Sequence, residues 1–367
     1  MDIVRLSKKV VLYSVLILSA TLFGSLHVTF AQTSIEPDTL KIGLLISTNE
    51  MKEAKRGAEL AIQEANRINF LQGKNIHLIT RSMEGPWGTG AKQTVDLVFN
   101  EKVWAIIGSN DGRNAHLAEQ VTAKTQQVYI STLSGDPTLA QAYVPWFFSL
   151  VPNNIQQANS LYKEIYGERD QRILIIADQD YDTENALGFF LDEIKRNNRE
   201  KPDVLKYTTQ DFDPDLVSQN ISYEKAEVLV LFSHPKETIE ILSSVKKLPS
   251  DFHIYGTFTV LGENPNRVFD TEDFEGMIVP DVRYLSSTSG KYFVEQYHSK
   301  FGTTATPVAS YAYDAVWLIL WEIQKSDFNL ELFKQQLRNA EYEGVTGIIR
   351  FDKIGNRLQD FIWIELE

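Results

Sequence analysis

Residues 40–46, Leu-Lys-Ile-Gly-Leu-Leu-Ile, form an apolar run of strand length, and the segment after them has a different hydrophobic period. Between 50 and 69, small and apolar residues such as Ala54 and Ala58 recur at helical spacing. A second apolar run follows at 76–80. A strand, a helix and a strand in this order predict a βαβ unit with parallel strands, on which a helix with a small-residue face packs closely.

The same alternation continues to the C-terminus and predicts an α/β protein. Further strands are predicted at 104–107, 128–130, 172–177, 204–207, 228–232, 253–256 and 276–279. Further helices are predicted at 90–100, 112–125, 155–166, 184–198, 235–247, 290–301, 308–324 and 330–339. A chain of 367 residues is too long for one compact core, so we expect two lobes, each with its own parallel sheet.

Three segments are candidates for connections between the lobes. The stretch from Trp146 to Asn154 is interpreted as an extended crossover, because it ends at Pro152 and is followed by a helix start. Polar breaks at 280–289 and 350–355 are the two other candidates.

The first 31 residues have the layout of a secretory signal. A basic start precedes the apolar run 10–26, and a small-residue exit ends at Ala31, after which we predict cleavage. An uncleaved membrane anchor is the alternative, since the apolar run is nearly long enough to span a bilayer. The chain has no cysteine that could carry a lipid or form a disulfide. The expected location is therefore the periplasm.

Composition and motifs argue against several classes of function. The formal net charge of −13 disfavours a nucleic-acid partner. The glycine-rich loop 85–92 differs from a phosphate-binding loop, because Ala91 separates the last glycine from Lys92 and Gln93 follows. No two histidines have the helical spacing of a metal site, and no Gly-x-Ser-x-Gly sequence occurs. We therefore expect no metal, no cofactor and no enzymatic activity.

In an open parallel sheet, ligands bind beyond the carboxyl ends of the strands. The residues that follow the predicted strands are thus candidate ligand contacts. They are Asn49, Trp87, Ser109, Asn110, Asp111, Leu133, Ser134, Tyr181, His234 and Thr257.

Acidic residues stand where two helices are expected to begin, after Asp111 and after Asp182. The free N–H groups of such helix starts attract a carboxylate; alternatively, both aspartates only cap their own helices. The acidic stretches 178–182 and 211–215 lack the spacing of a calcium loop and are interpreted as solvated loops and caps.

Seven short segments occur in one order across nearly the whole chain. They are Lys41–Leu45, Arg56–Ala61, Ala105–Gly108, Ile130–Ser131, Val151–Asn153, Tyr311–Trp317 and Gly344–Asp352. In this order they resemble the type I periplasmic binding proteins of the branched-chain amino-acid (leucine, isoleucine and valine) transport class. The resemblance implies two Rossmann-like lobes joined by three crossovers. Lobe 1 would comprise residues 40–149 and 283–344, and lobe 2 residues 152–280 and 345–367.

The resemblance also implies ligand contacts. Residues 109–114 and Leu133–Ser134 match the positions that hold the carboxylate and ammonium of an amino acid. The family's aromatic contact falls near Ser233–His234, and its ammonium-binding carboxylate near Thr257–Phe258, where this chain has no acidic residue. This departure argues against a plain aliphatic amino acid and leaves room for an amide, a small carboxylate or an aromatic compound as the ligand.

The resemblance implies that the protein binds a ligand and does not catalyse a reaction. We expect a monomeric solute-binding protein that closes around a small polar molecule and delivers it to an inner-membrane ABC permease. A receptor domain that signals ligand binding to a membrane partner is the alternative. A periplasmic enzyme is a third possibility, for which the sequence offers no nucleophile, metal set or cofactor loop.

Overall fold

The computed structural model describes residues 39–167, 171–249, 252–264, 266–267, 270–280, 287–359 and 362–366. The predicted signal segment, residues 1–31, lies outside this range. Within it, no helix combines the length and the apolar character needed to cross a membrane.

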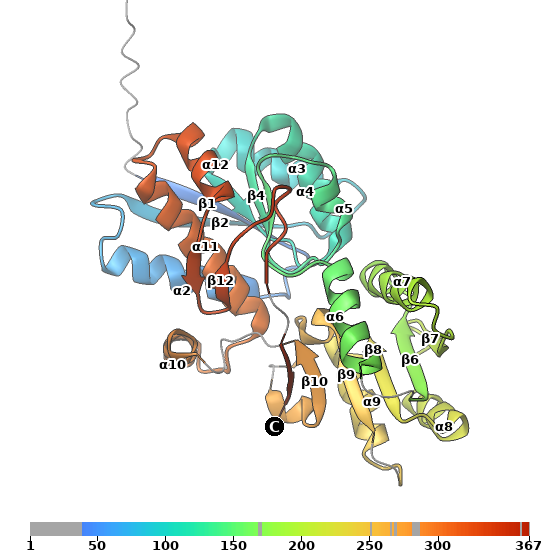
Figure 1. Cartoon of the computed structure of the whole chain (residues 1–367). Coiled ribbons are helices and arrows are strands. Elements are labelled where there is room, and N and C mark those ends of the chain that lie inside the picture. The colour runs from blue at the N-terminus through green and yellow to red at the C-terminus, as the bar shows by residue number, and fades with distance from the viewer. Residues whose placement is uncertain are drawn as a thin grey trace, which may run out of the picture. The chain divides into compact units, whose positions relative to one another are not determined.

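The first sheet has five parallel strands in the order β2-β1-β3-β4-β5 (Figure 1). The strands are β1 (Thr39–Ile46), β2 (Asn75–Ser82), β3 (Ala105–Ile107), β4 (Val128–Ser131) and β5 (Phe147–Ser149). The helices of this half are α2 (Glu53–Arg67), α3 (Thr89–Val95), α4 (Gly112–Thr125), α5 (Thr138–Gln141), α10 (Thr288–Phe301), α11 (Pro307–Lys325) and α12 (Leu330–Arg338). A π-helical turn, η1 (Asp96–Glu101), extends α3. We call this half lobe 1.

The second sheet has six strands in the order β13-β10-β9-β8-β6-β7. They are β6 (Ile173–Asp178), β7 (Asp203–Tyr207), β8 (Val228–Phe232), β9 (His253–Gly256), β10 (Met277–Pro280) and β13 (Trp363–Glu365). All pair in parallel except β13, which runs antiparallel to β10 at the edge (Figure 1). Its helices are α6 (Asn154–Tyr166), α7 (Tyr181–Arg196), α8 (Pro214–Glu224) and α9 (Pro235–Val245), with the 3₁₀ turns η2 (Phe258–Leu261) and η3 (Thr271–Phe274). We call this half lobe 2.

Each predicted strand and helix is present, with ends that shift by a few residues. The interpretation of 146–154 as one extended crossover is wrong for residues 147–149, because these pair with β4 as the fifth strand of lobe 1. The strand was missed because three residues are too short to show a hydrophobic period. Helix α8 was missed because its sequence is largely polar and shows no strong apolar face.

The small-residue face of α2 packs most tightly on α11 rather than on the sheet alone (Figure 1). A Cβ atom at Gly57 would lie 2.0 Å from the carbonyl oxygen of Ala309. Any larger side chain at position 57 would therefore push the two helix backbones apart. The alanines and glycine that predicted close packing on a sheet thus also serve close helix–helix packing.

A buried polar cluster lies where the chain returns from α11 towards lobe 2. The Asp314 carboxylate accepts hydrogen bonds from the Val345 and Thr346 N–H groups, both 2.8 Å, and from the Thr346 hydroxyl, 2.6 Å. The Arg357 guanidinium donates to Thr346 Oγ1, 3.0 Å, and to the Leu150 carbonyl, 2.9 Å. Asp314, Thr346 and Arg357 are all fully buried. We call these three residues the Asp314 cluster.

Next to the cluster, the segment around the first crossing lies against the segment that leads to β13. Ser149 forms a parallel bridge with Asn356, and Asn153 Nδ2 donates to Asn356 Oδ1 over 3.0 Å. The hairpin of β11 (Tyr342–Gly344) and β12 (Gly347–Ile349) packs on α11, in lobe 1. These contacts favour a third crossing beyond Arg357 rather than at residue 345, while the exact lobe boundaries stay a prediction.

Replacement of Arg357 by Met is expected to lower the free energy of unfolding by about 3–5 kcal/mol, because it leaves the buried Asp314 carboxylate without a nearby positive charge. Chemical denaturation measures the change. The exposed Arg350 provides the control, since Arg350→Met is expected to change stability by less than about 0.5 kcal/mol. Equal effects of the two substitutions would contradict a stabilising role for the cluster.

Candidate functional site

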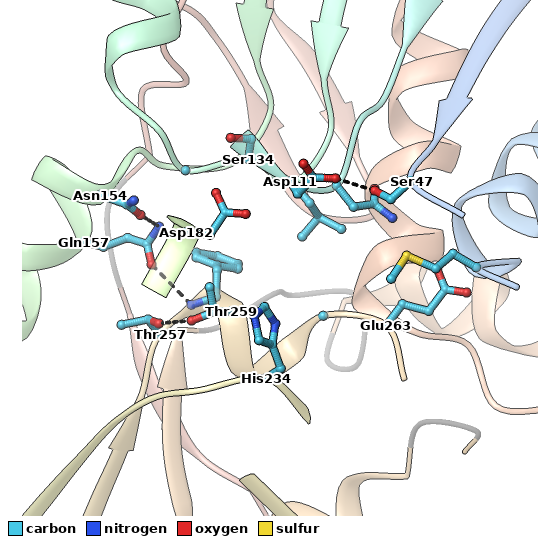
Figure 2. A pocket seen from close by; sticks show the side chains of 16 residues that line it. Ser47, Asp111, Ser134, Asn154, Gln157, Asp182, His234, Thr257, Thr259 and Glu263 are labelled. Atoms are coloured by element: carbon cyan, nitrogen blue, oxygen red, sulfur yellow. Dashed lines mark hydrogen bonds between the residues drawn. The ribbon is translucent and has the colours of Figure 1, made fainter. Parts of the chain in front are cut away.

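A cavity of about 150 Å³ lies at the carboxyl ends of strands from both sheets (Figure 2). A cavity of this volume in another protein holds a molecule the size of benzene. Its lining comes from both lobes and from the start of α6, next to the first crossing. The lining residues are Ser47, Met51, Asn110, Asp111, Leu133, Ser134, Gly135, Asn154, Gln157, Asp182, His234, Thr257, Phe258, Thr259, Gly262 and Glu263.

The lobe 1 wall centres on Asp111, the residue that caps α4. One of its carboxylate oxygens accepts from the Asn114 N–H, 2.8 Å, and the other from Asn114 Nδ2, 2.9 Å, and from the Ser47 hydroxyl. Asp111 is thus fully occupied within lobe 1. Beside it, the Asn110 amide nitrogen is buried and has no hydrogen-bond partner among the described residues. This donor is therefore free to meet a ligand.

Asp182 reaches across from lobe 2 to the start of α4. Its carboxylate accepts the Gly112 N–H at 2.9 and 3.2 Å. Burial, and then repulsion from Asp111, raises the pKa of Asp182 to about 7. The sequence predicted that the free N–H groups at the start of α4 attract a ligand carboxylate. In the structure the Asp182 carboxyl of the protein itself accepts the first of them, the Gly112 N–H.

The capping role expected for Asp182 is wrong, because α7 begins at Tyr181, three residues before the predicted start at 184. Asp180 is its cap and accepts the Thr183 N–H over 2.9 Å. Asp182 lies in the first turn, which frees its side chain to point into the cavity (Figure 2).

Glu263 forms a second link between the lobes. It follows η2 in lobe 2 and accepts the backbone N–H groups of Lys52 and Glu53, the latter at 3.0 Å, at the start of α2 in lobe 1. Its other oxygen, Oε2, is buried and has no hydrogen-bond partner among the described residues. Burial raises the pKa of Glu263 to about 7. Sequence reasoning missed this acid because it does not directly follow a strand.

The side of the cavity next to the first crossing is held by amides and hydroxyls. Gln157 Oε1 accepts the Phe258 N–H, 3.2 Å, while its Nε2 donates to the Pro152 carbonyl, 2.8 Å. The hydroxyls of Thr257 and Thr259 lie 2.6 Å apart. These hydrogen bonds fix η2 against α6, so Phe258 has a defined place in the lining.

A third link between the lobes lies outside the cavity. The Tyr181 hydroxyl, in lobe 2, donates to Asp136 Oδ2 of lobe 1 over 2.7 Å, and His116 Nε2 lies 2.9 Å from the same oxygen. Although burial alone would raise it, the hydrogen bonds from His116, Thr138 and Tyr181 hold the pKa of Asp136 at about 2. The hydrogen bond to Asp136 raises the pKa of His116 to about 9.

The cavity brings together six of the predicted contacts, namely Asn110, Asp111, Leu133, Ser134, His234 and Thr257. The other four do not line it. Asn49 bonds to Glu84 on the surface, 3.2 Å, and the Trp87 side chain is 81% exposed. Ser109 is fully buried and donates its N–H to the Tyr129 hydroxyl, and Tyr181 belongs to the link with Asp136. Contact with a ligand stays a prediction for all ten.

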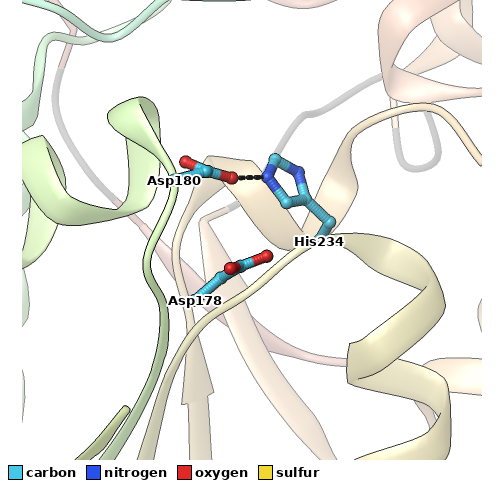
Figure 3. A group of neighbouring side chains, drawn as sticks. All are labelled: Asp178, Asp180 and His234. Carbon is cyan, nitrogen blue, oxygen red and sulfur yellow. Dashed lines mark hydrogen bonds and ion pairs between the residues drawn. The ribbon is translucent and has the colours of Figure 1, made fainter. Parts of the chain in front are cut away.

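One group of side chains has the composition of a metal site. Ligand atoms of Asp178, Asp180 and His234 lie within 4.8 Å of one another (Figure 3). A search for histidine pairs could not find it, because it has one histidine. The groups already have partners, since His234 bonds to Asp180 and the Thr209 hydroxyl donates to Asp178 over 3.0 Å. The His234–Asp180 hydrogen bond accounts for the arrangement without an ion.

A sequence profile of the periplasmic binding protein family matches residues 43–364, and the two-sheet architecture agrees with it. The chain belongs to this family. The family is one of extracytoplasmic binding proteins, which confirms the prediction of a solute-binding protein rather than an enzyme.

Two solved structures share the predicted type I fold with this family member. The branched-chain amino acid transporter substrate-binding protein LivJ of Streptococcus pneumoniae, in complex with isoleucine, is 18% identical, with a TM-score of 0.74 over 89% of this chain and 96% of LivJ. An ABC transporter solute-binding protein of Rhodopseudomonas palustris, in complex with 3,4-dihydroxybenzoic acid, is 16% identical, with a TM-score of 0.77 over 90% and 93% of the two chains. The predicted fold class is confirmed.

A plant protein is also similar. Glutamate receptor 3.1 of Oryza sativa subsp. japonica is 22% identical over 88% of this chain. The chain spans 40% of the length of that receptor.

The raised pKa values of Asp182 and Glu263 predict that the stability of the folded protein decreases as the pH rises. In the unfolded chain such carboxyls lose their proton near pH 4, whereas in the folded protein they hold it to about 7. The folded state binds more protons in this window, so the free energy of unfolding decreases as the pH rises from 4 to 7. Asp182→Asn is expected to flatten this decrease in melting temperature between pH 5 and pH 7. The same change at the exposed Asp192 of α7 should leave the wild-type slope, and equal slopes in all three proteins would contradict the prediction.

Proposed function

We propose that the protein is the solute-binding component of an ABC importer and captures a small polar molecule by closing two lobes around it. The observation that carries the proposal is the hydrogen bond between Asp182 of lobe 2 and the Gly112 N–H of lobe 1, beside a cavity lined from both lobes. A cavity so built exists only while the lobes are together. Ligand entry and release therefore require the lobes to separate.

Closure is expected to be driven by the ligand's contacts with both lobes. A ligand shifts a two-state equilibrium only by the difference between its affinities for the two states. A molecule that touches Ser134 in lobe 1 and Thr257 in lobe 2 gains its second set of contacts only on closure. The links made by Asp182, Glu263 and Tyr181 then add to the closed state alone.

The lining favours a molecule with one apolar part and several polar groups. Met51, Leu133 and Phe258 provide apolar surface, while the Asn110 amide and the Ser134 hydroxyl provide polar contacts. An amino acid, an amide or a small carboxylate has this character. LivJ with isoleucine and the R. palustris protein with 3,4-dihydroxybenzoic acid show that the fold accommodates both aliphatic and aromatic molecules.

In this proposal the protein is a periplasmic monomer, released by cleavage after Ala31, and its partner is an inner-membrane permease. The permease would recognise the closed form by its surface geometry. The alternative is a receptor domain, favoured by the similarity to a stretch of the much longer plant glutamate receptor. Deletion of the gene distinguishes the two. Cells without it are expected to lose uptake of the ligand if the protein is the importer component, and to keep uptake if it is a receptor domain.

A thermal-shift screen of residues 32–367 tests the binding function. At 100 times its dissociation constant, a ligand adds about 2.7 kcal/mol to the free energy of unfolding. At least one amino acid, amide, small carboxylate or amine is expected to raise the melting temperature in proportion to the logarithm of its concentration. A folded protein that responds to none of these classes would refute the proposed function.

Tyr181→Phe is expected to weaken the binding of any ligand found by about threefold to tenfold, because it removes a partly exposed hydrogen bond to a charged group that only the closed form makes. The loss should lie in a faster dissociation rate, which stopped-flow fluorescence measures. Tyr143, 72% exposed, provides the control, and Tyr143→Phe should not change the rate. An unchanged rate in Tyr181→Phe would mean that this link does not hold the lobes together.

A further inference from the structure

The charges of the cavity are unbalanced. Three carboxylates line it, those of Asp111, Asp182 and Glu263, and no lysine or arginine is found among its lining residues as described. His234 is the one lining residue there that can carry a positive charge, and Asp180 already accepts its Nε2 hydrogen bond. Buried carboxylates without a positive partner are unfavourable.

Two of the three carboxylates have unused capacity. Asp111 accepts from Ser47 and Asn114 with both oxygens, whereas among the described residues Asp182 accepts only the Gly112 N–H. Asp182 also faces the repulsion of Asp111, which contributes to the rise in its pKa. A positive group beside Asp182 would relieve this repulsion.

Glu263, on the opposite side of the cavity from Asp182, also has an oxygen without a hydrogen-bond partner among the described residues (Figure 2). Two backbone N–H groups of the α2 start occupy Oε1, while Oε2 is buried without a partner. Two arginines near Glu263 already have carboxylate partners, Arg56 with Glu53 at 2.9 Å and Arg267 with Asp273. Within the described residues Glu263 Oε2 thus has no partner, and a group on the ligand is a candidate for that place.

We propose that the ligand is a small organic cation, whose ammonium or similar positive group is neutralised in the closed cavity by Asp182 and Glu263. The inference rests on the proposed binding function and narrows its ligand class. The apolar part of the cation packs on Met51, Leu133 and Phe258. A ligand whose only charge is a carboxylate would instead add a fourth negative group to the cavity.

The test uses two series of molecules that share a carbon skeleton and differ in charge. One is benzylamine, benzamide and benzoate; the other is isopentylamine, isovaleramide and isovalerate, with leucine as the zwitterion and putrescine as a dication. Binding to residues 32–367 is measured by isothermal titration calorimetry at pH 7.5. A cation is expected to bind at least about tenfold more tightly than the amide and the carboxylate of its series, because only the cation makes charge-assisted hydrogen bonds to Asp182 and Glu263.

Glu263→Gln and Asp182→Asn are each expected to weaken the best cation by about tenfold or more, because they keep the shape and remove the charge. Glu275→Gln, an equivalent change at an exposed site of lobe 2, should have no effect. Circular dichroism confirms that each variant is folded.

The outcomes separate the inference from the proposed function. Tighter binding of leucine, an amide or a carboxylate than of any cation would overturn the inference and leave the binding function standing. Cation binding that survives both substitutions would also overturn it. A folded protein that binds no member of either series, nor leucine or putrescine, would count against both.

Discussion

The structure depends on the buried interaction of Asp314, Thr346 and Arg357. A carboxyl group and a guanidinium lie there away from water, which is tolerated because both make several hydrogen bonds. Burial raises the pKa of the Asp314 carboxyl, and the Thr346 hydroxyl, which donates to Asp314 and accepts from Arg357, joins the two groups. The interaction ties the end of lobe 1 to Leu150 in the first crossing, and so places the hinge.

Because the connections between the lobes are held in place, the shape of the cavity depends on how the two lobes are positioned. Asp182 and Glu263 lie on lobe 2, while the N–H groups they accept belong to the helix starts of lobe 1. Closure therefore makes these hydrogen bonds and, in the same step, buries two carboxylates. The hydrogen bonds stabilise the closed form, whereas burial of the two carboxylates destabilises it. The equilibrium between the open and closed forms therefore depends on the molecule that enters the cavity.

The fold was largely predictable because alternating strands and helices have distinct hydrophobic periods. The lobe 1 wall was predictable for a related reason, since Asn110, Asp111 and Ser134 directly follow strands of a parallel sheet. Glu263 could not be found in this way, because it follows a 3₁₀ turn that no sequence period announces. Gln157 was missed because it lies within the first turn of α6 and does not directly follow a strand.

The segments that resemble the family explain the hinge better than the ligand. Tyr311–Trp317 and Gly344–Asp352 contain Asp314 and Thr346, which meet in the buried cluster and do not line the cavity. Gly344 has a local reason of the same kind, because a Cβ atom there would lie 2.4 Å from the Asp314 carboxylate. Because these residues lie near the connections between the lobes, the resemblance supports the same type of hinge closure as in the family. It says little about what is bound, and that question depends on the residues that only the fold brings together, foremost Asp182 and Glu263.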